Sequence, residues 1–114
     1  MTPRIAVLVP CYNEEAAIGG VVRDFRRVLP GAVVYVYDNN SRDQTEAAAR
    51  EAGAVVRQEP RQGKGNVVRR MFADVDADIY VLVDGDNTYD AEAAPRLIRH
   101  AIESGTDLVT ARRI

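Results

Sequence analysis

Asp84 and Asp86 are the residues of this 114-residue sequence whose type and spacing most directly suggest chemistry. Two carboxylates on either side of a glycine supply hard oxygen ligands, which hold Mg²⁺ or Mn²⁺ together with the phosphates of a substrate. Gly85 lets the backbone pass close to a ligand, because it has no side chain. The pattern predicts a metal site at Asp84 and Asp86, and the alternative is a surface turn before a helix.

Gly63, Lys64 and Gly65 precede a segment with helical spacing. Backbone amides and the helix dipole favour anions at a helix N-terminus, and the lysine adds a positive charge. The motif predicts a phosphate contact, and the alternative is a flexible loop with a solvated lysine. Its spacing differs from that of a Walker A loop, and no G-x-G-x-x-G follows the first apolar run, which disfavours NAD and FAD.

Asp38 ends another apolar run, where its carboxylate can accept a hydrogen bond from a nucleotide base or a ribose hydroxyl. A turn acid before the next helix is the alternative interpretation. Cys11 could act as a nucleophile only with an activating base. We expect it to be structural, because the only histidine, His100, lies in a distant helical segment.

Five short apolar runs separated by helical segments must position these residues. This alternation predicts βαβ units, and therefore an α/β fold with an open, mainly parallel, Rossmann-like sheet covered by helices on both faces. Polar residues follow each run, at the sheet edge where such folds bind ligands. The predicted strands are Ile5–Val9, Val33–Tyr37, Ala54–Arg57, Ile79–Val83 and Leu108–Thr110.

Helix boundaries are also predicted from local signals. Small polar residues before a helix can cap its amides, and glycines commonly follow the last turn. The predicted starts are Asn13 capping a helix from Glu14, a Ser41–Gln44 capping box and Asp90 before Ala91, and the predicted stops are Gly31, Gly53 and Gly105.

Composition limits the classes of function. Fifteen basic and seventeen acidic residues give a net charge of −2, which disfavours nucleic acid as the main partner. A single cysteine excludes an internal disulfide and fits a cytoplasmic protein. The apolar runs are far shorter than the roughly 20 residues that a membrane span needs, so we expect no transmembrane segment.

Taken together, the motifs resemble family 2 glycosyltransferases with the GT-A fold, particularly the branch similar to polyprenyl-phosphate (dolichol-phosphate) sugar synthases. The resemblance spans nearly the whole chain but only the nucleotide-sugar-binding half of that family's domain. We therefore expect residues 1–114 to form one nucleotide-sugar-binding domain, truncated at its C-terminal end. The matching segments are Val9–Glu15, Asp38–Thr45, Gly63–Gly65 and Asp84–Asp86.

The resemblance implies roles for individual residues. Pro10, Tyr12 and Glu14 would frame the nucleotide, and Asp38 would contact its base. Asp84 would approach the ribose and the metal, and Asp86 would bind Mg²⁺ or Mn²⁺ across the diphosphate. The predicted nucleotide-sugar-binding residues are Pro10, Tyr12, Glu14, Asp38, Asn40, Lys64, Asp84, Gly85 and Arg112.

The activity that the resemblance implies is metal-dependent, inverting transfer of a sugar from a UDP- or GDP-linked donor, with a lipid phosphate such as polyprenyl phosphate as acceptor. Lys64 or Arg112 would help to stabilise the departing diphosphate. A hydroxyl acceptor would need a general base, which is not identified in this chain and which we expect beyond residue 114. A phosphate acceptor is already anionic and could attack without a base. We expect the enzyme in the cytoplasm or at the cytoplasmic membrane face.

Two alternatives stay open at this point. Asp84–Thr88 fits the D-x-D-x-T loop of haloacid-dehalogenase-like phosphatases, in which the first aspartate is a nucleophile. That loop follows the first strand in those enzymes, whereas here it follows the fourth predicted strand. The other alternative is a non-catalytic fragment that binds a nucleotide sugar.

Overall fold

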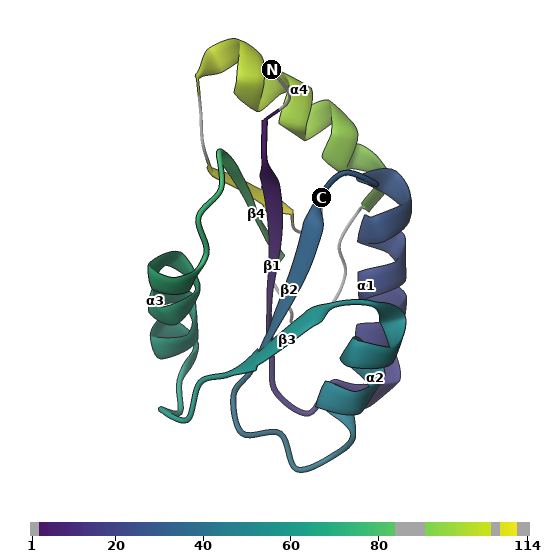
Figure 1. The fold of residues 1–114 in the computed structure, drawn as a ribbon, viewed down its shortest axis with the longest axis vertical. Coiled ribbons are helices and arrows are strands. Elements are labelled where there is room, and N and C mark those ends of the chain that lie inside the picture. Colours follow the sequence, from purple (N-terminus) through teal and green to yellow (C-terminus); the bar gives the residue numbers. More distant parts are fainter. Residues whose placement is uncertain (1–2, 84–90, 106–107, 112–114) are drawn as a thin grey trace.

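A computed structural model describes residues 3–83, 91–105 and 108–111 as a parallel sheet between helices (Figure 1). The sheet has five strands in the order β3-β2-β1-β4-β5, and every neighbouring pair is parallel. This confirms the predicted α/β class. The strands are β1 (Ile5–Cys11), β2 (Val33–Asp38), β3 (Val55–Gln58), β4 (Ile79–Val83) and β5 (Leu108–Ala111).

The helices follow the strands in alternation. Each predicted strand is present, and β1 extends past the predicted end at Val9 to Cys11. The helices are α1 (Glu15–Val28), α2 (Thr45–Ala52), α3 (Lys64–Asp74) and α4 (Ala94–Ser104), with a short 3-10 turn, η1 (Ala91–Ala93), before α4.

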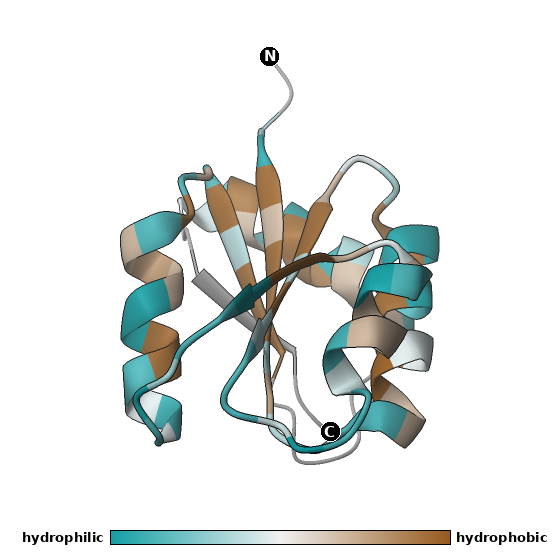
Figure 2. Cartoon of the chain, turned by 60° about the horizontal axis from the view of Figure 1, so that its bottom comes forward, coloured by the Kyte–Doolittle hydropathy of each residue, from teal (hydrophilic) through white to brown (hydrophobic). Residues whose placement is uncertain are grey.

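Alternate residues of the strands face opposite layers of helices. Val7 and Val9 of β1 pack in the cluster that includes α1, α2 and α4, whereas Ala6 and Leu8 pack in the cluster that includes α3. Figure 2 shows the mostly hydrophobic strands between helices that carry both hydrophilic and hydrophobic residues. Because both faces are covered, the strands are nearly continuous apolar runs rather than alternating ones.

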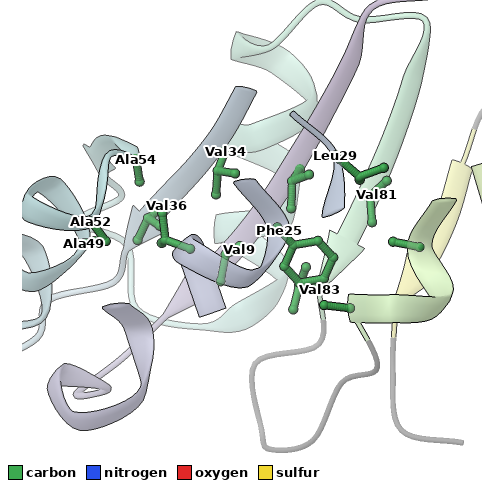
Figure 3. Close-up of a cluster of buried hydrophobic side chains, with 14 of the residues drawn as sticks. Val9, Phe25, Leu29, Val34, Val36, Ala49, Ala52, Ala54, Val81 and Val83 are labelled. Atoms are coloured by element: carbon green, nitrogen blue, oxygen red, sulfur yellow. The ribbon is translucent and has the colours of Figure 1, made fainter. Parts of the chain in front are cut away.

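Phe25 is the largest side chain of the α1 face of this core and has no exposed surface. Figure 3 shows it beside valines of the sheet, among them Val9, Val81 and Val83. Burying a phenylalanine side chain contributes about 1.5–3 kcal/mol. The core therefore fixes α1 on the sheet and, with it, the chain that leaves β1.

The strand register brings the polar loops to one edge. Cys11 lies opposite Asp38, and Asp38 lies opposite Gln58, so β1, β2 and β3 end side by side. These carboxyl ends lie at the bottom of Figure 1. In the strand order, β1 lies between β2 and β4, so the sheet grows from β1 in both directions. Open α/β sheets bind ligands at such a switch point.

Several helix boundaries differ from the predictions. Gly53 and Gly105 end α2 and α4 in the left-handed conformation, as expected. Gly31 does not end α1, since Leu29 is its C-cap and is held by the carbonyl of Phe25. Asp90 lies outside the described residues.

The two predicted side-chain caps are wrong. Asn13 has a φ of 53°, and its side-chain oxygen accepts from the amide of Arg42, so Glu14 rather than Asn13 is the N-cap of α1. The Ser41 hydroxyl donates to Asp38 instead of capping α2, whose N-cap is Gln44. The partner of Asn13 comes from another segment, which spacing along the sequence does not reveal, whereas Ser41 bonds to a residue three positions before it.

Candidate nucleotide-binding site

A pocket of about 250 Å³ lies where β1 ends beside the N-terminus of α3. It brings together four predicted site residues: Pro10, Tyr12, Glu14 and Lys64. Tyr12 is 49% exposed, so an aromatic surface is accessible at this pocket. The other lining residues are Cys11, Asn39, Gln62, Gly63 and Val67.

Lys64 is the first residue of α3, as the Gly63–Gly65 motif predicts. Gly63 precedes it with a φ of 125°, a conformation that L side chains rarely adopt. The carbonyl of Gly63 accepts the amides of Asn66 and Val67 and so starts the helix. The positive end of the helix dipole and the only lysine of the sequence therefore lie together at the pocket.

Asp38 and Asn40 lie beside the pocket and are not among its lining residues in the described part of the chain. Asp38 is 2% exposed, and its carboxylate accepts from the backbone amide of Ser41 at 3.1 Å and from the Ser41 hydroxyl. Asn40 has a φ of 67° and donates to the carbonyl of Pro60 at 3.0 Å. Both residues thus support the loops around the pocket.

Asn39, like Gln62 and Val67, lines the pocket and has no role in the sequence analysis. It is 5% exposed, and its side-chain amide donates to the carbonyls of Glu59 and Arg61 at 2.8 and 3.0 Å. Its side-chain oxygen accepts from the amide of Gly63 at 2.9 Å and from the Gln62 side chain at 3.2 Å. The only signal in the sequence is its place next to Asp38, because these partners become neighbours only when the sheet forms.

Asp43 joins the starts of α1 and α2. Its carboxylate accepts the amide of Glu15 at 3.2 Å and both the amide and the hydroxyl of Thr45. The Thr45 hydroxyl in turn accepts the amide of Glu14 at 2.8 Å. Hydrogen bonds from Thr45, and then the amide of Glu15, lower the pKa of Asp43 below its usual value. The chain around Glu14 is therefore set by the β2–α2 loop.

Cys11 is buried, with 4% of its surface exposed. Burial, followed by the nearby carboxylates of Glu14, Asp38 and Asp43, raises the pKa of its thiol well above the usual range. The thiol is therefore protonated at neutral pH and lacks the thiolate needed for nucleophilic attack. This supports the structural role expected for Cys11, and His100 lies on the exposed surface of α4.

The remaining predicted residues, Asp84, Gly85, Asp86 and Arg112, lie outside the described residues. Strand β4 ends at Val83, directly before Asp84 in the sequence. Within residues 3–83, 91–105 and 108–111, no group of three or more His, Cys, Asp or Glu side chains is arranged to hold a metal ion.

Residues 6–114 match the protein family described as Glycosyl transferase family 2. The chain belongs to this family. Among its family 2 relatives, the protein RfbJ of Shigella flexneri is 57% identical over 109 residues, which are 96% of this chain and 84% of RfbJ. The dolichyl-phosphate hexose transferase of Haloferax volcanii is 39% identical over 96% of this chain and 48% of that enzyme.

Solved structures show the same fold. Glucosyl-3-phosphoglycerate synthase of Mycobacterium tuberculosis in complex with Mn²⁺, UDP-glucose and phosphoglyceric acid is 30% identical, with a TM-score of 0.77 over 90% of this chain and 40% of that one. The same synthase has been crystallised with Mg²⁺ and UDP. The family 2 chain therefore has the sheet and helices of a partial GT-A fold.

The family 2 chain spans most of RfbJ but about half, or less, of the other two relatives. Family membership favours the glycosyltransferase interpretation over the phosphatase alternative for Asp84. Among the described helices, none is long and apolar enough to cross a membrane.

Proposed function

We propose that this chain binds the nucleotide part of a nucleotide-diphosphate sugar and serves metal-dependent, inverting sugar transfer. The observation that carries the proposal is the pocket in which Pro10, Tyr12, Glu14 and Lys64 meet, at the carboxyl edge of a family 2 chain. Pro10, Tyr12 and Glu14 lie in one segment at the end of β1, whereas Lys64 comes from a distant segment, the start of α3. Their meeting at one pocket supports a common ligand.

The pocket chemistry suits a nucleotide. Pro10 and Tyr12 offer apolar and aromatic surface, while Lys64 and the start of α3 offer positive charge. An aromatic ring can stack on a base, and a helix N-terminus favours anions. The pocket thus combines the two kinds of contact that a nucleoside diphosphate needs.

Asp84 and Asp86 are the residues that would hold Mg²⁺ or Mn²⁺. The donor chemistry of this edge fits such a hard cation, because its ionisable ligands are carboxylates and its one thiol, Cys11, is buried. When bound, the cation would stabilise negative charge on the diphosphate. Glucosyl-3-phosphoglycerate synthase, 30% identical, has been crystallised with Mn²⁺ and UDP-glucose.

We further propose a lipid phosphate as the acceptor, with the Haloferax dolichyl-phosphate hexose transferase as support. A phosphate oxygen of the acceptor would form the new bond to the anomeric carbon while the bond from that carbon to the donor diphosphate breaks. The bonding electrons leave with the diphosphate, and Lys64 and Arg112 would stabilise that charge. Because the attacking oxygen is already anionic, no general base from this chain is needed.

A second candidate is binding without transfer. Its support is that this chain matches only 40% of glucosyl-3-phosphoglycerate synthase. More than half of that enzyme therefore has no counterpart among these 114 residues. Donor binding is common to both candidates. Measuring sugar transfer by the 114-residue chain distinguishes them, since transfer would refute the non-catalytic alternative.

The test is calorimetric titration of the chain with UDP and GDP, with and without Mn²⁺. We expect metal-dependent binding of one nucleotide, about ten-fold weaker in Lys64→Ala, which corresponds to roughly 1.4 kcal/mol. Arg69→Ala is the matched control, because Arg69 is an exposed cation further along the same helix. Equal losses in both variants would contradict a specific role for Lys64.

Asp86→Asn tests the metal site in the same titration. We expect it to abolish the effect of Mn²⁺, whereas Asp76→Asn, a change to an exposed acid before β4, leaves that effect intact. Absence of binding by the folded, unmodified chain to either nucleotide would refute the proposed function.

A further inference from the structure

The loop between β3 and α3 forms one wall of the pocket. The Asn39 side chain makes four hydrogen bonds to it, and Asn40 adds bonds to Pro60 and Gln62. Gln62, Gly63 and Lys64 line the pocket from this loop and from the start of α3. The loop itself is exposed at Pro60, Arg61 and Gln62. The position of this loop therefore depends on its contacts with the buried residues at the end of β2.

Asn39 supplies those contacts and uses its full hydrogen-bonding capacity. A side-chain amide has two donors and an oxygen with two lone pairs. Asn39 donates to two loop carbonyls, of Glu59 and Arg61, and accepts from Gly63 and Gln62. Four positions of the loop, 59 and 61–63, are thus bonded to one buried residue, while the carbonyl of Pro60 between them is bonded by Asn40.

Asn39 is itself fixed to the sheet. Its backbone amide donates to the carbonyl of Cys11 at 2.9 Å, which continues the β1–β2 pairing past the end of β2. Cys11 also lines the pocket. One residue therefore sets the distance between the β1 wall of the pocket and the β3–α3 wall.

A second buried group holds the same loop from the other side. The Glu59 carboxylate accepts the amide of Arg61 at 2.7 Å and lies 3.9 Å from the guanidinium of Arg70 on α3. These contacts fix the first part of the loop only. The contact to Gly63, which sets the start of α3, comes from Asn39.

We propose that Asn39 is a positioning residue that determines nucleotide affinity by holding Gln62, Gly63 and Lys64 in the pocket wall. This inference rests on the proposed function. Replacing Asn39 by alanine leaves the carbonyls of Glu59 and Arg61 and the amide of Gly63 without these partners, so the wall relaxes. Small displacements of binding groups have large effects on ligand interactions.

The experiment compares Asn39→Ala with the unmodified chain by calorimetric titration with UDP and GDP in the presence of Mn²⁺, and by hydrogen exchange of the Gly63 amide without ligand. We expect the tighter nucleotide to bind at least about ten-fold more weakly and the Gly63 amide to exchange faster. Gly63→Ala is the second variant, because it strains the same turn, at a φ of 125°, without removing a buried amide. It should weaken binding in the same way if Asn39→Ala does not fold.

Tyr80→Phe is the matched control. The Tyr80 hydroxyl also holds a connection, by donating to the carbonyl of Val75 at 2.9 Å and accepting the amide of Ala77 at 3.2 Å, but before β4, at the opposite edge of the sheet. We expect this variant to bind within two-fold of the unmodified chain.

The possible failures are distinguishable. If the unmodified chain binds neither nucleotide, the proposed function falls, and this inference falls with it. If the unmodified chain binds but the Asn39 and Gly63 variants bind like Tyr80→Phe, or the Gly63 amide of Asn39→Ala exchanges at the original rate, the inference alone is overturned.

Discussion

The two edges of the sheet are built from polar residues in opposite ways. At the carboxyl edge, four polar residues are buried. Asn39 and Thr45 are hydrogen-bonded to backbone of other segments, and Asp38 and Glu59 to the turns that follow them. The buried polar residues of the described chain all lie there, at or after the ends of β2 and β3: Asp38, Asn39, Thr45 and Glu59. At the amino edge, Arg4 pairs with Asp76 and Asp78, and these side chains are 62%, 87% and 47% exposed.

The difference shows which edge of the sheet is stabilised more strongly by its polar side chains. A buried polar group that loses its partner destabilises the fold by about 1–3 kcal/mol, whereas an exposed ion pair contributes about 0–1 kcal/mol. The buried side-chain hydrogen bonds therefore stabilise the carboxyl edge more than the exposed ion pairs stabilise the amino edge. The pocket that we propose to bind a nucleotide lies at the edge that holds the buried polar groups.

Thr45→Val should have the largest effect on this comparison. Valine keeps the shape but removes the hydroxyl that accepts the amide of Glu14 and donates to Asp43, and Thr45 has no exposed surface. We expect the free energy of unfolding in urea to fall by about 1–3 kcal/mol. Thr45→Ser, which keeps both hydrogen bonds, should lose less, and equal losses would show that the hydroxyl is not what stabilises this edge.

Asp43→Asn should have a smaller effect that depends on pH. The pKa of Asp43 is lowered in the folded state, so its carboxylate stabilises the fold above its unfolded pKa of about 4, and this contribution is lost as the pH falls through the lower folded pKa. The variant should therefore be less stable at pH 7 and approach the original below about pH 4. Urea unfolding across this range measures it, and a stability difference independent of pH would contradict the assignment.

Arg4→Ala should have the smallest effect. The pairs of Arg4 with Asp76 and Asp78 are exposed, so we expect no measurable change in thermal stability at physiological salt. The pKa of Asp78 is lowered first by the backbone amide of Arg4 and then by its side chain. An NMR titration should show this pKa rising only in part, because alanine keeps the backbone amide, and a full return to the usual value would assign the shift to the side chain.

The edge comparison also separates what sequence patterns could predict from what they could not. The strands, the helices and the parallel direction of the strands were predictable, because buried strands need continuous apolar runs and each βα unit is local in sequence. The start of α3 at Lys64 was predictable for the same reason, since Gly63 and the following helix are adjacent. The start of α1 was not, because Asp43 and Thr45 accept amides about 30 residues away.

The sequence by itself determined the chemistry of this protein: the family 2 motifs, the order of the strands' polar loops and the lysine and acids available to a nucleotide sugar. Only the tertiary structure decided which of them meet. Pro10, Tyr12, Glu14 and Lys64 line one pocket, whereas Asp38 is turned toward Ser41 and Asn39 holds the opposite wall. The physical reason is that hydrogen bonds between loops depend on strand register, which arises from packing of the whole sheet and has no local signature.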